Sequence, residues 1–112
     1  MQSVLVHPQT VVVRPQEYVN AANASTLQDQ LTIAVKSEQT SALLVDMQNV
    51  ESLDSAGLMV LVSTLSLAQR QYKRFSLCSI SASIRIIFEL TQLDSIFEIF
   101  EDSAAFEATI AE

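Results

Sequence analysis

Three short apolar runs in the first half of the sequence have the pattern of β-strands. Residues 1–6 and 10–13 are rich in β-branched side chains, and His7-Pro8-Gln9 lies between them. This arrangement predicts a strand, a turn and a second strand, whose pairing Pro15 ends because proline has no N–H to donate. Residues 41–46 (Ser-Ala-Leu-Leu-Val-Asp) form a continuous apolar run, which is typical of a strand buried on both faces of a sheet.

Apolar residues spaced three or four positions apart predict two longer helices. The first follows Asn20, which can cap it, and ends at Lys36. The second covers about residues 55–72, and basic residues at its end suit the negative C-terminal end of a helix. The first helix has Leu27, Leu31 and Val35 on its apolar face, the second has Leu58, Leu61, Val62, Leu65, Ala68 and Tyr72, and the basic residues are Arg70, Lys73 and Arg74.

Strand and helix alternate again in the last third of the chain. Residues 75–79 have the pattern of a strand, Ser81 can cap a third helix, residues 96–100 form a possible edge strand, and a last helix begins at Asp102 or Ser103. The third helix has Ile84, Ile87, Phe88 and Thr91 on one face, and the last contains Phe106 and Ile110. The order β-β-α-β-α-β-α-β-α predicts an α/β fold with parallel crossovers. We expect a single domain over residues 1–112, with a mixed sheet of four to five strands and about four helices.

Charge is distributed unevenly along the chain. The sequence has 13 acidic and 6 basic residues, for a net charge of −7, and all the basic residues lie at or before Arg85. The acids from Glu89 onward have no basic residue among them. Because the chain lacks a basic run, it cannot neutralise enough phosphates for ordinary nucleic-acid binding.

Composition excludes several further classes of protein. Hydrophobic content of 49% with 17% charged residues is not a disordered composition. The longest apolar or small run, residues 56–62, is far shorter than the roughly 20 residues of a membrane span, and no basic region followed by an apolar core marks a secretory signal. One cysteine and one histidine cannot build an intramolecular disulfide or a common metal site. We therefore expect a cytoplasmic domain that holds no metal and no cofactor.

The tetrapeptide Asp54-Ser55-Ala56-Gly57 carries the strongest functional signal. It opens the longest helix, where unpaired backbone N–H groups and the helix dipole favour negative charge. Gly57 is the only glycine, so a partner chain or a nucleotide phosphate could approach here, and Asp54 could hold the Ser55 hydroxyl or align a metal–nucleotide complex. A phosphate on Ser55 would add up to about two negative charges beside Asp54. The simpler alternative is that Ser55 is only an N-cap and that Gly57 only lets the helix pack closely.

The sequence around this motif resembles the STAS domain, the anti-sigma-factor antagonist family. The central signature is matched in two pieces, and the later pieces agree in order and spacing. The pieces are Leu43-Leu44-Val45-Asp46, residues 50–58 (Val-Glu-Ser-Leu-Asp-Ser-Ala-Gly-Leu), Phe75-Ser76-Leu77-Cys78, the helix over 81–90, Leu90-Thr91-Gln92-Leu93-Asp94 and Ile96-Phe97-Glu98-Ile99. In this family the serine after the aspartate is phosphorylated by a partner serine kinase that is also the anti-sigma factor. The resemblance therefore implies that Ser55 is the phosphorylated residue.

Four positions depart from the family's pattern. Glu17 stands where glycine is usual in the turn before the first helix, and Asn20 keeps the capping role of an aspartate without its charge. Gln92 replaces the frequent glycine that ends the third helix. Ala56 stands where a second serine is common, which leaves Ser55 the only hydroxyl inside the motif.

Four other residues near the motif are further candidates. Ser52 has a weaker signal, and the other three have two interpretations each. Ser52 is a second hydroxyl in the same loop, but it lacks the position at a helix start that favours phosphorylation of Ser55. Asp46, at the carboxyl end of the buried strand, either points toward the crevice where α/β folds place function or caps a loop. Met59 and Val60 lie within one turn of Ser55 and either form an apolar docking patch or pack under a neighbouring helix.

Three further features have a plain structural interpretation. His7 before Pro8 fits a surface residue at a strand end better than a catalyst. Cys78 in a strand fits a small core residue better than a reactive thiol. We expect the basic residues at the end of the second helix to be solvated.

The resemblance implies a regulatory binding module and not an enzyme. In its unphosphorylated form the protein would bind a serine-kinase anti-sigma factor, and phosphorylation of Ser55 would release it. Such a bacterial phosphoprotein would regulate transcription, and a serine phosphatase acting on Ser55 is a further expected partner. Because the chain is acidic, the partner should present a basic surface. The expected partner-binding residues are Asp54, Ala56, Gly57, Met59, Val60 and Asn20.

Two alternatives remain open. The first is a constitutive STAS scaffold subunit of a transporter or signalling complex that is not phosphorylated. The second is an enzyme or nucleotide binder, but no Gly-rich phosphate loop, Ser/His/Asp set or metal cluster in the sequence supports it.

Overall fold

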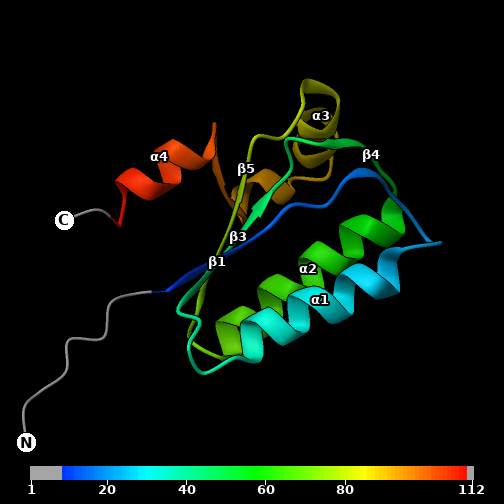
Figure 1. The fold of residues 1–112 in the computed structure, drawn as a ribbon. Coiled ribbons are helices and arrows are strands. Elements are labelled where there is room, and N and C mark those ends of the chain that lie inside the picture. The colour runs from blue at the N-terminus through cyan, green and yellow to red at the C-terminus, as the bar shows by residue number, and fades with distance from the viewer. Residues whose placement is uncertain (1–8, 111–112) are drawn as a thin grey trace, which may run out of the picture.

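A four-stranded parallel sheet forms the centre of the molecule (Figure 1). The computed structural model describes residues 9–110. The strands lie in the order β1 (Thr10–Val13), β3 (Ala42–Asp46), β5 (Arg74–Cys78) and β6 (Glu98–Phe100), and each neighbouring pair is parallel. Every residue of β3 is buried, as its apolar run predicted. The α/β class is confirmed, while the strand expected over residues 1–6 and His7 lie outside the described residues.

A separate two-stranded sheet was not expected from the sequence. In it β2 (Glu17–Val19) pairs in parallel with β4 (Val50–Leu53), two segments that the pattern had indicated as a turn and a connection. These strands are too short to show an alternating pattern, and the pairing register shifts between Glu17 and Tyr18, where Glu17 has a left-handed φ of 60°. All strand pairs among residues 9–110 are parallel and form two sheets, in place of the single mixed sheet that we expected.

Helices α1 (Ala24–Lys36) and α2 (Ser55–Arg70) lie side by side over one face of the main sheet (Figure 1). The predicted apolar face of α1 is buried, and the helix ends at Lys36 as expected. The prediction that Asn20 caps α1 is wrong, because Asn23 occupies the N-cap position. Asn20 instead starts a turn, in which its side-chain oxygen accepts from the Ala22 N–H at 2.9 Å and its carbonyl accepts from the Asn23 N–H at 3.1 Å.

The second helix ends two residues earlier than predicted. Tyr72 lies beyond the end of α2 with a φ of 57° and an almost fully exposed side chain, so it is not part of the apolar face. The Tyr72 N–H donates to the Gln69 carbonyl at 3.2 Å, and the Lys73 N–H donates to the Ala68 carbonyl at 2.9 Å. This pair of bonds is a Schellman motif, which turns the chain directly into β5.

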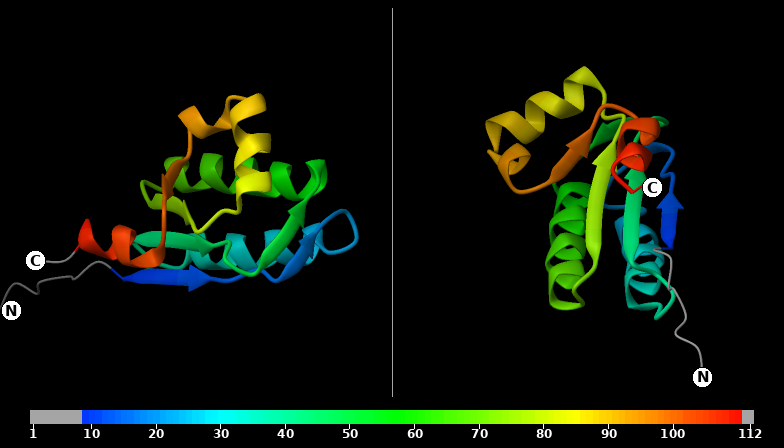
Figure 2. Two further views of the ribbon diagram at one scale, coloured as in Figure 1. Left: turned by 90° about the horizontal axis from the view of Figure 1, so that it is seen from above. Right: turned by 90° about the vertical axis from the view of Figure 1, so that its left-hand side faces the viewer.

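The opposite face of the main sheet is covered by α4 (Ser103–Ala108), as Figure 2 shows. Leu43 and Val45 of β3 belong to the larger core under α1 and α2. Ala42 and Leu44 face the other way and pack with Phe106 of α4. Because consecutive residues of a strand point to opposite faces, this one strand contributes to both layers of the core.

Helix α3 (Ala82–Leu90) and the short 3₁₀-helix η1 (Leu93–Ser95) connect β5 to β6. Ser81 caps α3 as predicted, because its hydroxyl oxygen accepts from the Ile84 N–H at 3.3 Å. Cys78 is fully buried in the α4 layer, which agrees with the interpretation as a core residue, and burial raises the pKa of its thiol. Within residues 9–110, no helix is long and apolar enough to cross a membrane.

The basic residues after α2 do not form the solvated helix end that we expected. The Lys73 ammonium donates to the Val35 carbonyl at 2.6 Å and to the Ser37 carbonyl, so it neutralises the negative C-terminal end of α1 and not that of α2. Only Arg70 remains on the surface of α2, where it donates to the Ser66 hydroxyl at 2.8 Å.

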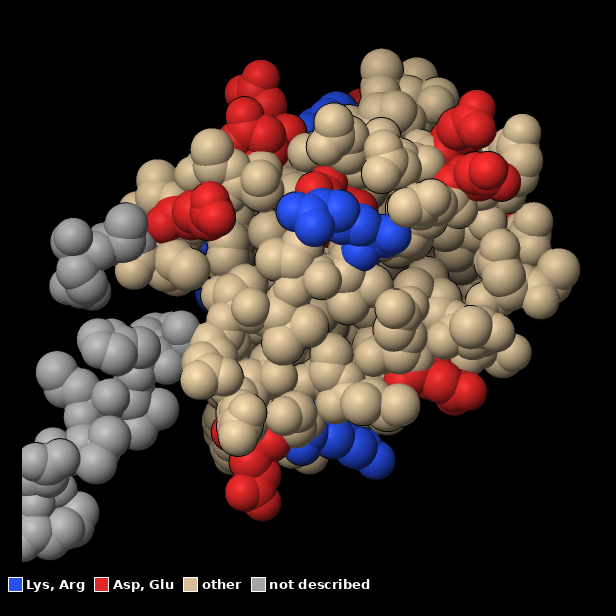
Figure 3. Space-filling view, in the orientation of Figure 1, with Lys and Arg blue, Asp and Glu red and all other residues tan. Residues whose placement is uncertain are grey.

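Arg74 joins β5, β6 and α4. Its guanidinium donates to both carboxylate oxygens of Glu98, at 2.7 and 2.8 Å, and to the Thr109 hydroxyl at 2.8 Å, while lying 4.7 Å above the centre of the Phe106 ring. The hydrogen bond from Arg74 holds the pKa of Glu98 below its ordinary value. One of the acids near the C-terminus is therefore compensated in space by a basic residue from earlier in the chain. Figure 3 shows separate acidic groups over one face of the molecule.

Candidate functional site

Ser55 is the first residue of α2 and its side chain is exposed. The N-cap is Asp54, whose Oδ1 accepts from the Gly57 N–H at 3.0 Å. The interpretation of Ser55 as only an N-cap is therefore wrong. None of the side-chain hydrogen bonds within residues 9–110 uses the Ser55 hydroxyl, so this hydroxyl can be modified without the loss of an internal bond.

Asp54 also connects α2 to the loop before α1. Its second carboxylate oxygen accepts from the Ala21 N–H at 3.2 Å, and its own N–H donates to the Val19 carbonyl at 3.0 Å. Asp54 does not hold the Ser55 hydroxyl, because both of its carboxylate oxygens accept from backbone N–H groups. Asp54 therefore fixes the direction in which α2, and Ser55 with it, leaves the small sheet.

Gly57 is buried against the small sheet. A Cβ added to it would lie 2.6 Å from Leu53 Cδ1, 2.6 Å from Val19 Cγ1 and 2.9 Å from the Val19 carbonyl oxygen. The close approach that this glycine permits is thus made by strands β2 and β4 of the same chain. Of the two interpretations of Gly57, close packing of the helix is the one that the structure supports, and the residue is not open to a partner or a phosphate.

Exposed residues on α2 and on the two-stranded sheet lie in the region of Ser55. Met59, one helical turn further on, is 61% exposed, and Tyr18 of β2 is 51% exposed. Tyr18 pairs with the exposed Ser52 of β4, and both lie on the face of the two-stranded sheet opposite Val19 and Leu53, which pack against Gly57 of α2. Sequence reasoning missed Tyr18 because it missed strand β2, and an aromatic residue inside the short run Glu17-Tyr18-Val19 was the one signal available.

The other expected partner-binding residues lie below this surface or at its edge. Val60 is only 4% exposed and belongs to the core, so the second of its two interpretations holds, while Met59 alone is available for docking. Ala56 and Asn20 are half-buried. Val60 and Gly57 can therefore support a binding surface from beneath but cannot contact a partner in this structure.

Asp46 acts as a loop cap and does not open into a crevice. One of its oxygens accepts from the Gln48 N–H at 3.0 Å, and the other accepts from Arg14 Nε at 3.1 Å. The Asp46 side chain is buried, whereas Arg14 is largely exposed. This pair closes the carboxyl ends of β1 and β3.

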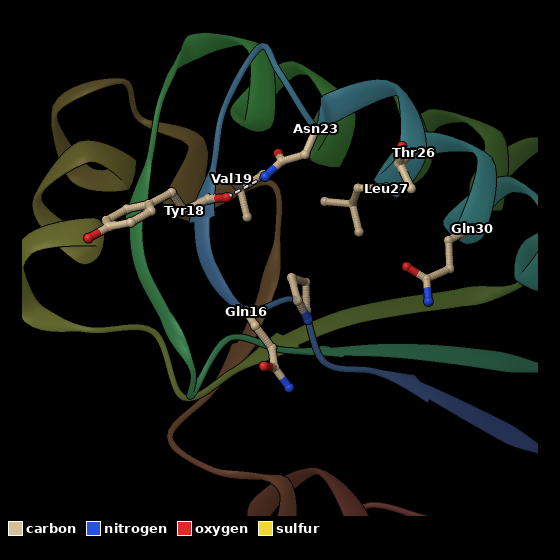
Figure 4. Close-up of a pocket in the computed structure, with 8 residues that line it drawn as sticks. Gln16, Tyr18, Val19, Asn23, Thr26, Leu27 and Gln30 are labelled. Carbon is tan, nitrogen blue, oxygen red and sulfur yellow. Dashed lines mark hydrogen bonds between the residues drawn. The ribbon is translucent and has the colours of Figure 1, made fainter.

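A shallow pocket of about 140 Å³ lies between β2 and α1 (Figure 4). Asn23 Nδ2 donates to the Tyr18 carbonyl at 2.6 Å beside it, and the Tyr18 ring points away from it. The pocket is lined by Pro15, Gln16, Tyr18, Val19, Asn23, Thr26, Leu27 and Gln30. None of these side chains is charged, so the lining provides no cation for the phosphates of a nucleotide.

Solved structures share this fold. The chain resembles a candidate anti-sigma factor antagonist from Thermotoga maritima with a TM-score of 0.84 and 22% identity, covering 90% of this chain and 86% of that one. It resembles the Bacillus cell fate determinant SpoIIAA in its phosphorylated form with a TM-score of 0.71 and 16% identity, covering 96% and 97%. It also resembles the STAS domain of a SulP transporter from Vibrio cholerae, with a TM-score of 0.69 and 13% identity, covering 92% and 85%.

The sequence itself matches the STAS domain family over residues 2–106. This range contains both sheets and the Asp54–Ser55 helix start. The chain belongs to the STAS domain family.

Proposed function

We propose that this chain is an anti-sigma-factor antagonist that is switched by phosphorylation at Ser55. Unphosphorylated, it binds a serine-kinase anti-sigma factor, and phosphorylation by that kinase releases it. The observation that carries the proposal is the exposed Ser55 hydroxyl on the first residue of α2, held in place by Asp54 and not used in the fold. The likeness to SpoIIAA in its phosphorylated form supports the same assignment.

The position of Ser55 allows a phosphate to be added without unfolding the helix. The phosphate would add about two negative charges at the N-terminal end of α2, where the helix dipole is positive. Asp54 would continue to cap the helix, because its oxygens bond the Gly57 and Ala21 N–H groups and not Ser55. We therefore expect phosphorylation to change the surface and leave the fold intact.

Release follows from the surroundings of Ser55. Met59, one helical turn after Ser55 and 61% exposed, offers apolar area beside the hydroxyl, so a partner that covers it also removes Ser55 from water. A charged phosphate resists this desolvation, and the Asp54 carboxylate beside it adds to the repulsion of any acidic group on the partner. In this proposal the chain acts in the cytoplasm, has no catalytic activity of its own, and is returned to the binding form by a serine phosphatase.

The test combines modification with binding. The protein is incubated with a purified serine-kinase anti-sigma factor and ATP, and the phosphate is mapped by mass spectrometry, which should find it on Ser55 and not on Ser52. Calorimetry should show that Ser55→Ala binds the kinase like the parent and that Ser55→Asp binds at least about tenfold more weakly. Ser63→Asp, on the exposed side of the same helix, is the matched control and should bind like the parent. Phosphate at another residue, or equal binding by Ser55→Asp, contradicts the proposal.

A constitutive scaffold is the second candidate, because the STAS domain of a SulP transporter has the same fold. A scaffold would bind its partner through the same fold without a phosphate switch. It predicts equal binding of the partner by Ser55→Ala and Ser55→Asp, and no transfer of phosphate from ATP. The binding experiment above therefore separates the two candidates.

A further inference from the structure

Helix α3 has a second apolar face that nothing in the described structure covers. Ile84 and Phe88 point into the core, yet Ile86 is 54% exposed and Leu90 is 79% exposed. Together with the exposed Ala82, these residues are spaced four apart, which places them in one stripe along the outer side of the helix. Figure 2 shows α3 at the outside of the molecule, away from α1 and α4.

Two opposite charges lie along one flank of this stripe. Arg85 and Glu89 are both exposed and one helical turn apart. The ion pairs within residues 9–110 are Arg14–Asp46 and Arg74–Glu98, so neither Arg85 nor Glu89 is used in one. The stripe thus combines exposed apolar area with a positive and a negative group in a fixed order.

We propose that this face binds α3 of a second copy of the chain in an antiparallel, twofold-symmetric dimer. With the twofold axis near Ile86, the small Ala82 of each copy lies opposite the large Leu90 of the other, so the two stripes are complementary in shape. In a twofold contact the same patch is used by both copies, and in an antiparallel helix pair each flank meets the same flank of the other helix. Arg85 of each copy then lies beside Glu89 of the other, which gives two equivalent ion pairs. A parallel pair would bring this flank against Ser83 and Ile87 instead.

The size of the contact predicts a weak dimer. A nine-residue helix is about 13 Å long, and paired helices approach to about 8–10 Å between axes, so each copy buries only roughly 300–400 Å². This area lies below the roughly 800 Å² per partner of a stable complex. We expect a reversible dimer with a dissociation constant of about 100 μM. Binding of two copies to one partner would raise their local concentration and favour the dimer.

Sedimentation equilibrium on the full chain tests the proposal, at protein concentrations from about 10 μM to about 1 mM and at low salt, where ion pairs are least screened. The parent should change from monomer to dimer over this range. Ile86→Glu should abolish the dimer, whereas Ile33→Glu should leave it unchanged, because Ile33 is also a large exposed aliphatic residue (72%) but lies on α1. Far-UV circular dichroism of both variants excludes unfolding as the cause.

Exchange of the two charges gives the sharpest test. Arg85→Glu and Glu89→Arg each place like charges across the contact, so each should weaken self-association by about tenfold. An equimolar mixture of these two variants, and the double variant Arg85→Glu/Glu89→Arg, should both recover the association of the parent. A parent that stays monomeric at about 1 mM, or single variants that associate like the parent, overturns the proposal. Loss of kinase binding in Ile86→Glu together with a monomeric parent would assign this face to the kinase, which also overturns it.

Discussion

Substitution of the single glycine tests the close contact between α2 and the two-stranded sheet of β2 and β4. In Gly57→Ala the new Cβ would lie 2.6 Å from two side-chain carbons and 2.9 Å from a backbone oxygen, whereas ordinary contacts begin at 3.4 Å. The helix and the small sheet must therefore separate by about 0.5–0.8 Å. The atom that is hardest to move is the Val19 carbonyl oxygen, because it also accepts the Asp54 N–H at 3.0 Å.

The expected cost follows from these contacts. Overpacking of this degree costs about 1–3 kcal/mol, and weakening of the hydrogen bond from Asp54 to Val19 costs up to about 1 kcal/mol. Replacing glycine by alanine in a helix returns at most about 1 kcal/mol, and less in the first turn than in the interior. We therefore expect Gly57→Ala to lower the free energy of unfolding by about 2 kcal/mol, with a fall in Tm of about 8 °C.

Urea unfolding followed by far-UV circular dichroism measures this change, since the chain has no tryptophan to report by fluorescence. Ser55→Ala is the matched control, because it changes the neighbouring exposed residue and should alter stability by less than about 0.5 kcal/mol. A Gly57→Ala protein as stable as the parent would refute the reasoning, because the helix and the small sheet would then have room for the methyl group.

Three further predictions concern other parts of the fold. Tyr72 and Gln92 have left-handed φ angles (57° and 61°), which glycine adopts without the steric cost that a side chain brings. Tyr72→Gly and Gln92→Gly should therefore each raise the free energy of unfolding, measured in urea, by about 0.5–1 kcal/mol. A loss of stability in both variants would contradict this. Because the hydrogen bond from Arg74 lowers the pKa of Glu98 in the folded state, its contribution to stability is present above the ordinary glutamate pKa of 4.5 and is lost as the pH falls through the lower folded value. Stability should thus fall more steeply below pH 4.5 in the parent than in Glu98→Gln, and parallel curves would count against it. The Cys78 thiol should react with Ellman's reagent only after denaturant is added, because burial excludes the reagent and raises the pKa of the thiol. Rapid reaction in native buffer would show that the α4 layer opens.

Local patterns in the sequence were sufficient for the helices and the buried strand. The spacing of Leu27, Leu31 and Val35 predicted the buried face of α1, and the apolar run at residues 41–46 predicted β3, which covers residues 42–46. The position of Ser55 at the start of α2 also follows from local signals, because a capping residue and a following apolar face are neighbours in the chain. Two positions where the family usually has glycine were also informative, since Glu17 and Gln92 both have the left-handed backbone that glycine favours.

Contacts between distant segments were decided only by the tertiary structure. The pairing of β2 with β4 joins residues that are more than thirty positions apart and too few to form a pattern, and it brings Val19 and Leu53 together against Gly57 of α2. The role of Gly57 likewise depends on which strands come to lie against it. The sequence therefore determined which segments are helical and that the Ser55 hydroxyl lies at the start of a helix, because those features depend on neighbouring residues. Which side chains surround that hydroxyl, and which acids find a basic partner, as Glu98 finds Arg74, depends on long-range packing that no local pattern contains.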